Sequence, residues 1–252
     1  AYNAGGEIIG GGASYMHFLL ADSSAGVEVM VTSAGEVDHI ELHPHVLLRL
    51  THGSASSMPA DAQALRIVDQ GFSQNGNEVG FGMIVENPNS GYAVDEGYYY
   101  ITMYDADGNV IATVDEDSGV ILPNQTIGIG EYYYGIWDLG DVASVDFQFT
   151  AAVFEAVAET PGFTFENVTY VPDDNPMVTG DVLNPFAQDL TMPVVSALCY
   201  NEAGDVAGGG STRIRLLPAN GRESVGVSVS CAGIPARVEM YVAIDSLAEI
   251  GR

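Results

Sequence analysis

The chain has 252 residues, of which 34 are acidic and only 7 are basic, so its formal net charge at pH 7 is -27. Every basic residue is an arginine, and no cationic side chain occurs between Arg66 and Arg213. Such a charge repels phosphate backbones and anionic lipid headgroups, which argues against nucleic-acid binding and against docking on anionic membranes. It suits a solvated acidic surface, multivalent cations or a high-salt medium.

Compartment is indicated by three features of the sequence. No stretch reaches the roughly 18 apolar residues of a membrane span. The sequence begins at Ala1 rather than Met, as signal-peptide cleavage leaves it, although cytosolic removal of Met gives the same result. The two cysteines, Cys199 and Cys231, would pair in an extracellular setting, the alternative being two buried free thiols. We therefore expect a secreted protein at the cell surface.

Residues 1–60 predict an N-terminal β segment with strands at 16–20, 27–31 and 39–50. A few strands of this size bury too little apolar surface to be stable alone. This segment is therefore expected to pair either with the rest of the chain or with another chain.

Residues 61–252 contain an internal repeat with a period of roughly one hundred residues. Four landmarks recur in the same order. They are Asn87-Pro88 and Asn184-Pro185, the turns after Tyr104 and Tyr200, Leu122-Pro123 and Leu217-Pro218, and the segments 142–146 and 235–239. The repeat predicts two domains, at 61–158 and 159–252.

Each copy is expected to be all-β. In the first copy, strands are predicted at 81–85, 98–104, 110–114, 127–136 and 142–153, with 151–158 also compatible with a helical turn. In the second copy they are predicted at 177–183, 194–200, 213–217, 225–231 and 238–244. Short strands separated by turn signals predict two tandem immunoglobulin-like β-sandwiches.

The segment Ile101-Thr102-Met103-Tyr104-Asp105, its following Asp-Gly turn and the later Leu-Pro pair resemble the FxLYD-type immunoglobulin-like domains of prokaryotic cell-envelope proteins. The second copy has Ala197-Leu198-Cys199-Tyr200-Asn201 at the same place. The resemblance covers residues 61–252. It implies an extracytoplasmic location and no enzymatic activity, and it supplies no catalytic residues.

The sequence also lacks the common catalytic motifs. Without lysine there is no P-loop and no Schiff-base residue, and no Gly-x-Ser-x-Gly segment occurs. All five histidines lie between positions 17 and 52, far in sequence from most carboxylates. We expect a protein that is not an enzyme.

Two groups of side chains are candidate metal ligands. In an extended strand His39, His43 and His45 share one face with Glu41, where they suit Zn²⁺ or Cu²⁺ unless that face is simply solvated or interfacial. Asp105, Asp107 and Asn109 resemble half of a calcium loop, although the Asp-Gly turn accounts for them equally well.

Other surface features are candidates for modification or contact. Asn124 and Asn167 begin glycosylation sequons. Tyr98–Tyr100 and Tyr132–Tyr134 place rings on both faces of their strands, which predicts either sticky surfaces or a core with half-exposed phenols.

Two functions compete on this reading. The first is a structural subunit of a cell-surface filament, sheath or surface layer, self-associating by β-strand addition and by head-to-tail contact between unlike ends. Five of the seven arginines lie in the second copy, which favours such unlike ends. The alternative is a monomeric envelope binding module for a metal ion or small ligand, and no other cofactor is expected.

Overall fold

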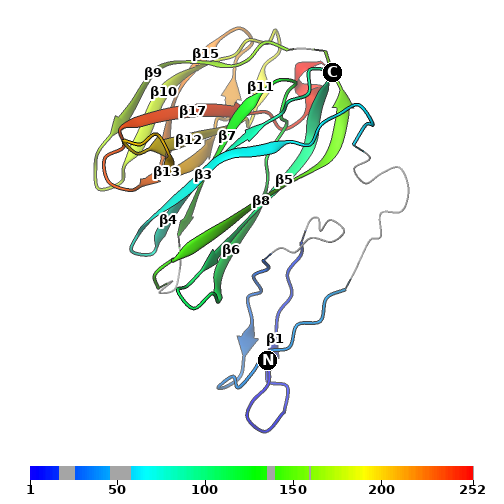
Figure 1. Cartoon of the computed structure of the whole chain (residues 1–252), viewed down its shortest axis with the longest axis vertical. Helices are drawn as coiled ribbons and strands as arrows, with labels where there is room; N and C mark the ends of the chain where they lie inside the picture. The colour runs from blue at the N-terminus through cyan, green and yellow to red at the C-terminus, as the bar shows by residue number, and fades with distance from the viewer. Residues whose placement is uncertain (17–25, 46–57, 135–139, 159, 252) are drawn as a thin grey trace.

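A computed structural model of the chain describes residues 1–16, 26–45, 58–134, 140–158 and 160–251. These residues form an all-β protein with antiparallel sheets (Figure 1), and their only helix is the short 3-10 helix η1 at Leu247–Ile250. The fold class predicted from the sequence is therefore confirmed.

The first half of the body is a sandwich of two three-stranded sheets. One sheet has the order β3-β4-β7, with β3 at Arg66–Asn75, β4 at Glu78–Glu86 and β7 at Thr126–Tyr134. The other has the order β6-β5-β8, with β6 at Val110–Asp117, β5 at Tyr92–Tyr104 and β8 at Ser144–Ala156. Alternate apolar residues of both sheets, such as Phe81, Met83 and Ile101, fill the space between them and are fully buried.

The second half repeats this strand order and adds one edge strand, β16. One sheet is β15-β10-β9, with β9 at Thr164–Val171, β10 at Met177–Leu183 and β15 at Arg222–Ser228. The other is β16-β13-β12-β17, with β12 at Val194–Tyr200, β13 at Val206–Arg213, β16 at Ser230–Cys231 and β17 at Arg237–Ala243. A two-stranded ladder joins β11 at Leu190–Thr191 to β14 at Leu216–Leu217. The repeat thus corresponds to a repeated topology, and the division into two domains stays a prediction.

The two Asn-Pro landmarks make the same contacts. The buried Asn87 amide donates to the carbonyl oxygens of Tyr92, Ile121 and Leu122. The buried Asn184 amide donates in the same way to Gln188, Leu217 and Pro218. Each asparagine therefore ties the end of one strand to the Leu-Pro turn, which explains why both landmarks recur together.

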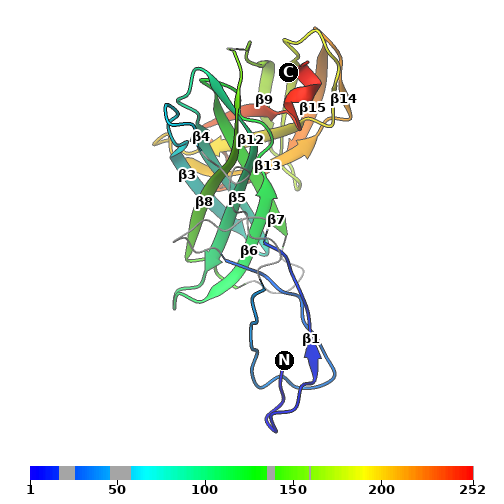
Figure 2. The ribbon, with the colours of Figure 1, turned by 90° about the vertical axis from the view of Figure 1, so that its right-hand side faces the viewer.

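The two sandwiches stack face to face, with sheet β3-β4-β7 lying against sheet β16-β13-β12-β17 (Figures 1 and 2). Glycines allow this close approach. A methyl group added at Gly71 would lie 1.9 Å from the Val206 carbonyl oxygen, and one at Gly130 would lie 2.6 Å from that of Gly210. Ile84, Leu198 and Val206 form a small apolar cluster at this contact. The body is thus a stack of four sheets.

Residues 1–16 and 26–45 form an arm that projects from the first sandwich, away from the second (Figures 1 and 2). Its regular structure is limited to the pair β1 (Gly10–Gly11) and β2 (Thr32–Ser33), with bridges from Tyr2 to Ile8 and His39. Near its base, Gly26 lies close to Thr102 and Thr113 of the body. The base of the arm therefore contacts the body, and the rest of the arm extends away from the body.

Several predicted strands differ from the structure. The predicted strand at 27–31 is not formed, and the described part of 39–50 has only a bridge at His39. Most of the strand at 16–20 lies outside the described residues. The strand predicted at 213–217 is instead β13, which ends at Arg213, followed by the short β14. Strands β3 and β9 were not predicted, since their solvated faces carry polar residues that weaken the apolar pattern.

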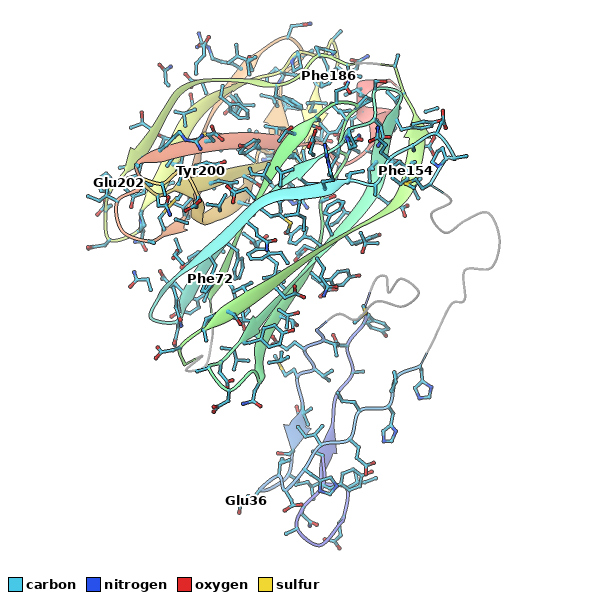
Figure 3. All side chains as sticks on the ribbon, in the orientation of Figure 1. Glu36, Phe72, Phe154, Phe186, Tyr200 and Glu202 are labelled. Atoms are coloured by element: carbon cyan, nitrogen blue, oxygen red, sulfur yellow. A yellow bond between two sulfur atoms is a disulfide. The ribbon has the colours of Figure 1, made fainter. Side chains whose placement is uncertain are left out.

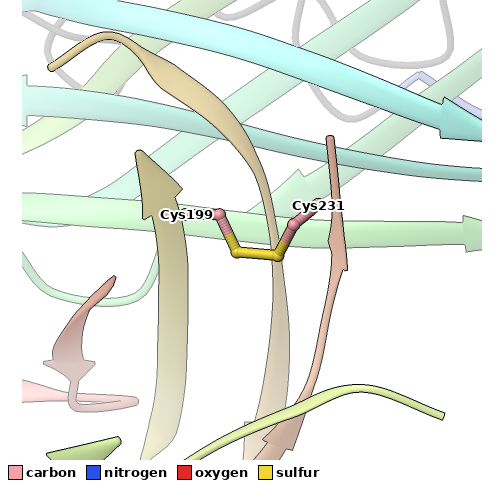
Figure 4. The surroundings of a disulfide bond; sticks show 2 residues. All are labelled: Cys199 and Cys231. Carbon is pink, nitrogen blue, oxygen red and sulfur yellow. A yellow bond between two sulfur atoms is a disulfide. The ribbon is translucent and has the colours of Figure 1, made fainter. Parts of the chain in front are cut away.

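Cys199 and Cys231 form a disulfide between β12 and β16, with Cα atoms 5.9 Å apart (Figure 4). The predicted pairing is therefore confirmed. On the chain-entropy model, closing a loop of this length stabilises the folded protein by about 3–4 kcal/mol.

Candidate functional site

The predicted histidine face is part of the arm, but its side chains do not converge on one point. His39 Nδ1 lies 2.9 Å from Asp38 Oδ2, and its ring stacks on Tyr2 with centroids 4.8 Å apart. His43 Nε2 lies 3.3 Å from Glu41 Oε2. Within the described ranges no group of three or more His, Cys, Asp or Glu side chains is arranged to hold a metal ion. A metal at His39, His43 and His45 stays a prediction, and His17 and His52 lie outside the described residues.

The predicted calcium residues form the turn between β5 and β6. Asp105 Oδ1 accepts from the backbone N–H groups of Asp107 and Asn109 at 2.9 and 2.8 Å, and its Oδ2 accepts from the Asn109 side chain. That side-chain bond lowers the pKa of Asp105 below its usual value. Asn201 closes the matching turn in the second half through Asp205. The carboxylate of Asp105 thus already has donors, and calcium binding stays a prediction.

Both sequon asparagines are exposed, as glycosylation requires. Asn124 lies in the turn before β7 with φ 56°. Asn167 lies on β9, and its amide donates to Asp181 Oδ2 at 2.8 Å. Their modification stays a prediction.

The tyrosine clusters are largely internal. Tyr99 and Tyr100 are 4% and 3% exposed, and the Tyr99 hydroxyl donates to Glu131 at 3.0 Å. Burial raises the pKa values of both Tyr99 and Glu131. Tyr134 is the cluster member with a largely exposed side chain, at 60%. The tyrosine clusters therefore form little exposed surface through which subunits could associate.

Two cavities lie beside these tyrosines. One, of about 350 Å³, lies at the base of the arm and is lined in part by Tyr15, Met30, Tyr133 and Glu28. The other, of about 250 Å³, lies between the two sandwiches and is bordered by Glu116, Glu131 and Arg213, among others. Both combine aromatic or hydroxyl groups with carboxylates, which suits small cationic ligands better than anions.

The most unusual feature is the exposed apolar surface of the arm. Met30, Ile40 and Leu42 are 75%, 55% and 65% exposed, and Ile8 is 74% exposed. In the described part of the chain, residues 26–31 and 40–45 belong to no strand or bridge, although Met30 lies beside Gly12. Exposed apolar side chains on unpaired extended chain favour pairing with a sheet edge.

The arm is also strongly acidic. Its described residues include five carboxylates, at Glu7, Glu28, Glu36, Asp38 and Glu41, and contain no lysine or arginine. Figure 3 shows Glu36 near the far end of the arm. An acidic and apolar segment of this kind is complementary to a surface with exposed apolar and cationic side chains.

Sequence reasoning placed the histidines and an unpaired β segment in this region, but it did not identify the exposed apolar residues. Alternation of apolar residues at 40 and 42 with polar residues at 39, 41 and 43 predicted a strand with one buried face. In the structure the side chains of Ile40 and Leu42 are exposed instead, which the sequence pattern does not indicate.

Comparison with known proteins adds little. No protein-family model matches the chain, and no curated protein matches it. The crystal structure of red sea bream transglutaminase is similar over 71% of this chain and 31% of that chain, with 11% sequence identity and a TM-score of 0.24. A similarity this weak carries no argument, so the FxLYD resemblance stays a prediction. In the described parts of the chain, no helix is long and apolar enough to cross a membrane.

Proposed function

We propose that this protein is a non-enzymatic, extracellular structural subunit of a cell-surface assembly such as a filament, sheath or surface layer. Subunits join by addition of the arm as a β-strand to a neighbour's sheet edge, in head-to-tail order. The observation that carries the proposal is the projecting arm, whose Met30, Ile40 and Leu42 side chains are exposed on chain that belongs to no strand.

Strand addition supplies the arm with hydrogen-bond partners and with an apolar surface to pack against. The backbone of 40–45, which belongs to no strand in the described part of the chain, gains ladder hydrogen bonds, and the exposed apolar side chains of the arm leave water. Burying the exposed apolar area of two such side chains contributes roughly 2–4 kcal/mol, which is enough to change assembly by orders of magnitude.

The architecture of the body suits a structural subunit. Stacking of four sheets through glycine contacts leaves the two sandwiches in direct backbone contact rather than joined by a linker alone. The Cys199–Cys231 disulfide is compatible with an extracellular protein. The charge of -27 keeps free subunits apart at low salt and is screened at high salt.

The test compares the wild type with a variant carrying Ile40→Glu and Leu42→Glu. Both side chains are exposed, so the substitutions leave the folded body unchanged. We expect light scattering and negative-stain microscopy, over a range of salt and Ca²⁺ concentrations, to show regular polymers for the wild type alone. Val110→Glu, at a body side chain that is 52% exposed, is the matched control and should assemble normally.

The second candidate is a monomeric binding module. The cavity at the base of the arm favours it, since Tyr15, Tyr133, Glu28 and Met30 suit a small organic cation. A protein that stays monomeric under every condition, and whose thermal unfolding shifts with a stoichiometric ligand or metal ion, would support this function instead.

A further inference from the structure

The end of the molecule opposite the arm carries a small patch formed by Met192, Arg215 and Leu216. The ladder between β11 and β14 builds it, with Thr191 paired to Leu216 and the Met192 N–H donating to the Arg215 carbonyl oxygen. Leu190 and Leu217 of the same ladder are fully buried, so the neighbouring residues face outward. Met192 and Leu216 are 44% and 45% exposed. We call these three residues the corner patch.

Arg215 forms no ion pair with any residue that the structure describes. Of the five arginines in the described residues, Arg66, Arg213, Arg222 and Arg237 each lie within 4.0 Å of a carboxylate, and Arg215 does not. Its side chain is exposed in a protein that has 34 acidic residues. It is therefore available to an anionic partner without first breaking an internal pair.

The backbone of the corner patch is strained. Met192 has φ 55°, in the left-handed region that residues with a Cβ adopt rarely. Such a conformation costs on the order of 1–3 kcal/mol and is found preferentially at binding sites. Here it accompanies an apolar side chain exposed to water.

The arm complements this patch in charge, in polarity and in position. It has five carboxylates and no lysine or arginine in its described residues, together with exposed apolar side chains. Figure 2 shows the arm at one end of the long axis and β14 at the other. A contact between opposite ends of identical subunits does not close on itself within a pair, so it produces an open polymer.

We propose that the corner patch is the acceptor for the arm of a second copy of this chain. The apolar arm residues pack on Met192 and Leu216, and an arm carboxylate pairs with Arg215. On β11 the Thr191 N–H and hydroxyl already donate to Glu249 Oε1, so the incoming arm would add at β14, which has no second partner strand among the described residues. This inference rests on the proposed function and adds the surface at which subunits join.

Another exposed apolar side chain, Ile234, fits an acidic arm less well. It is 80% exposed, but its cationic neighbour Arg237 already pairs with Glu239 and lies 3.7 Å from the centre of the Tyr200 ring. Docking an arm carboxylate there would compete with both contacts, whereas Arg215 has none to lose.

Two measurements test the acceptor. The first compares the critical concentration for assembly of the wild type and of Arg215→Glu. At the lowest salt concentration at which the wild type assembles, we expect the variant to need at least about tenfold more protein, because like charges then meet at the contact. Arg66→Glu changes the net charge equally and lies in the first sandwich, so it is the control and should assemble like the wild type.

The second measurement is cross-linking between two kinds of subunit. One kind carries Leu216→Cys and the other carries a cysteine in place of Ile8, Met30, Ile40 or Leu42, the natural cysteines being held in their disulfide. We expect a disulfide-linked pair in mixed polymers for at least one arm position. Mixtures of Leu216→Cys with Val110→Cys should give none.

The outcomes separate this inference from the proposed function. If the wild type assembles but Arg215→Glu assembles equally well, and Leu216→Cys links to no arm position, the acceptor is wrong and the assembly function stands. If the wild type stays monomeric under all conditions, both proposals are wrong. Weakened assembly of Arg215→Glu together with arm cross-links supports both.

Discussion

At the residue scale, the buried amides of Asn87 and Asn184 are the most informative positions. Each supplies donors to three backbone carbonyls and ties the Asn-Pro turn to a Leu-Pro turn 34 or 35 residues away. Buried carbonyl groups without donors are costly. The recurrence of these residues in the sequence therefore reflects their hydrogen bonds as well as the local effect of proline.

Asn184→Ala tests this role. It removes donors from the carbonyls of Gln188, Leu217 and Pro218 and the acceptor of the Phe186 N–H. We expect the free energy of unfolding in urea to fall by about 2–4 kcal/mol. Asn124→Gly is the control, since an exposed asparagine with φ 56° tolerates glycine, and it should change stability by less than about 0.5 kcal/mol. Equal effects of the two variants would contradict the assigned role.

The buried carboxyl group of Glu131 makes the stability of the fold depend on pH. Burial raises its pKa, and hydrogen bonds from the Tyr132 N–H and the Tyr99 hydroxyl offset part of that rise. A raised pKa means that the ionised carboxylate destabilises the folded state; this cost shrinks as the pH falls through the folded-state pKa and is gone below the unfolded-state pKa. Glu131→Gln should therefore unfold at a higher temperature than the wild type at neutral pH, with the difference shrinking towards acidic pH. A variant less stable at neutral pH would mean that ionised Glu131 stabilises the fold.

At the scale of elements, the stacking of the sandwiches depends on glycines. Gly71, Gly82 and Gly130 lie opposite one another across β3, β4 and β7. An added methyl group at Gly130 would lie within 2.7 Å of the carbonyl oxygens of Gly210 and Ala197. Backbone atoms cannot move aside as a flexible side chain can, so the sheets would have to separate.

Gly130→Ala should therefore lower the free energy of unfolding by about 1–3 kcal/mol or more. Gly91→Ala is the matched control, since no atom lies within 4 Å of the added methyl group and its φ is not positive. Chemical denaturation followed by far-UV circular dichroism measures the stability of both variants. A loss at Gly91 as large as that at Gly130 would contradict the glycine contact.

Strands with strong apolar patterns were predictable from sequence. The predictions at 177–183 and 194–200 match β10 and β12, because both combine β-branched residues with clear turn signals. The stack of sheets was not predictable, since glycines such as Gly71 and Gly130 in a strand indicate a bulge or weak strand rather than a contact. The corner patch was also hidden, because Met192 and Arg215 meet only through the pairing of β11 with β14.

At the scale of the whole molecule, the two ends differ in chemistry. The arm is acidic and apolar, and the far end of the second sandwich carries the exposed Arg215, which pairs with no described carboxylate, beside two exposed apolar side chains. The stacked sheets lie between these ends along the long axis (Figure 2). The proposed head-to-tail association would bring these two ends together.

The central claim is that the arm pairs as a strand when subunits assemble, and backbone hydrogen exchange of the arm tests it most directly. Exchange of the amides in 26–31 and 40–45 is measured in dilute protein and in protein concentrated at high salt. We expect rapid exchange in the dilute sample and strong protection in the concentrated sample, because ladder hydrogen bonds shield the amides. Equally rapid exchange in both, in samples that scattering shows to be assembled, would contradict strand addition by the arm.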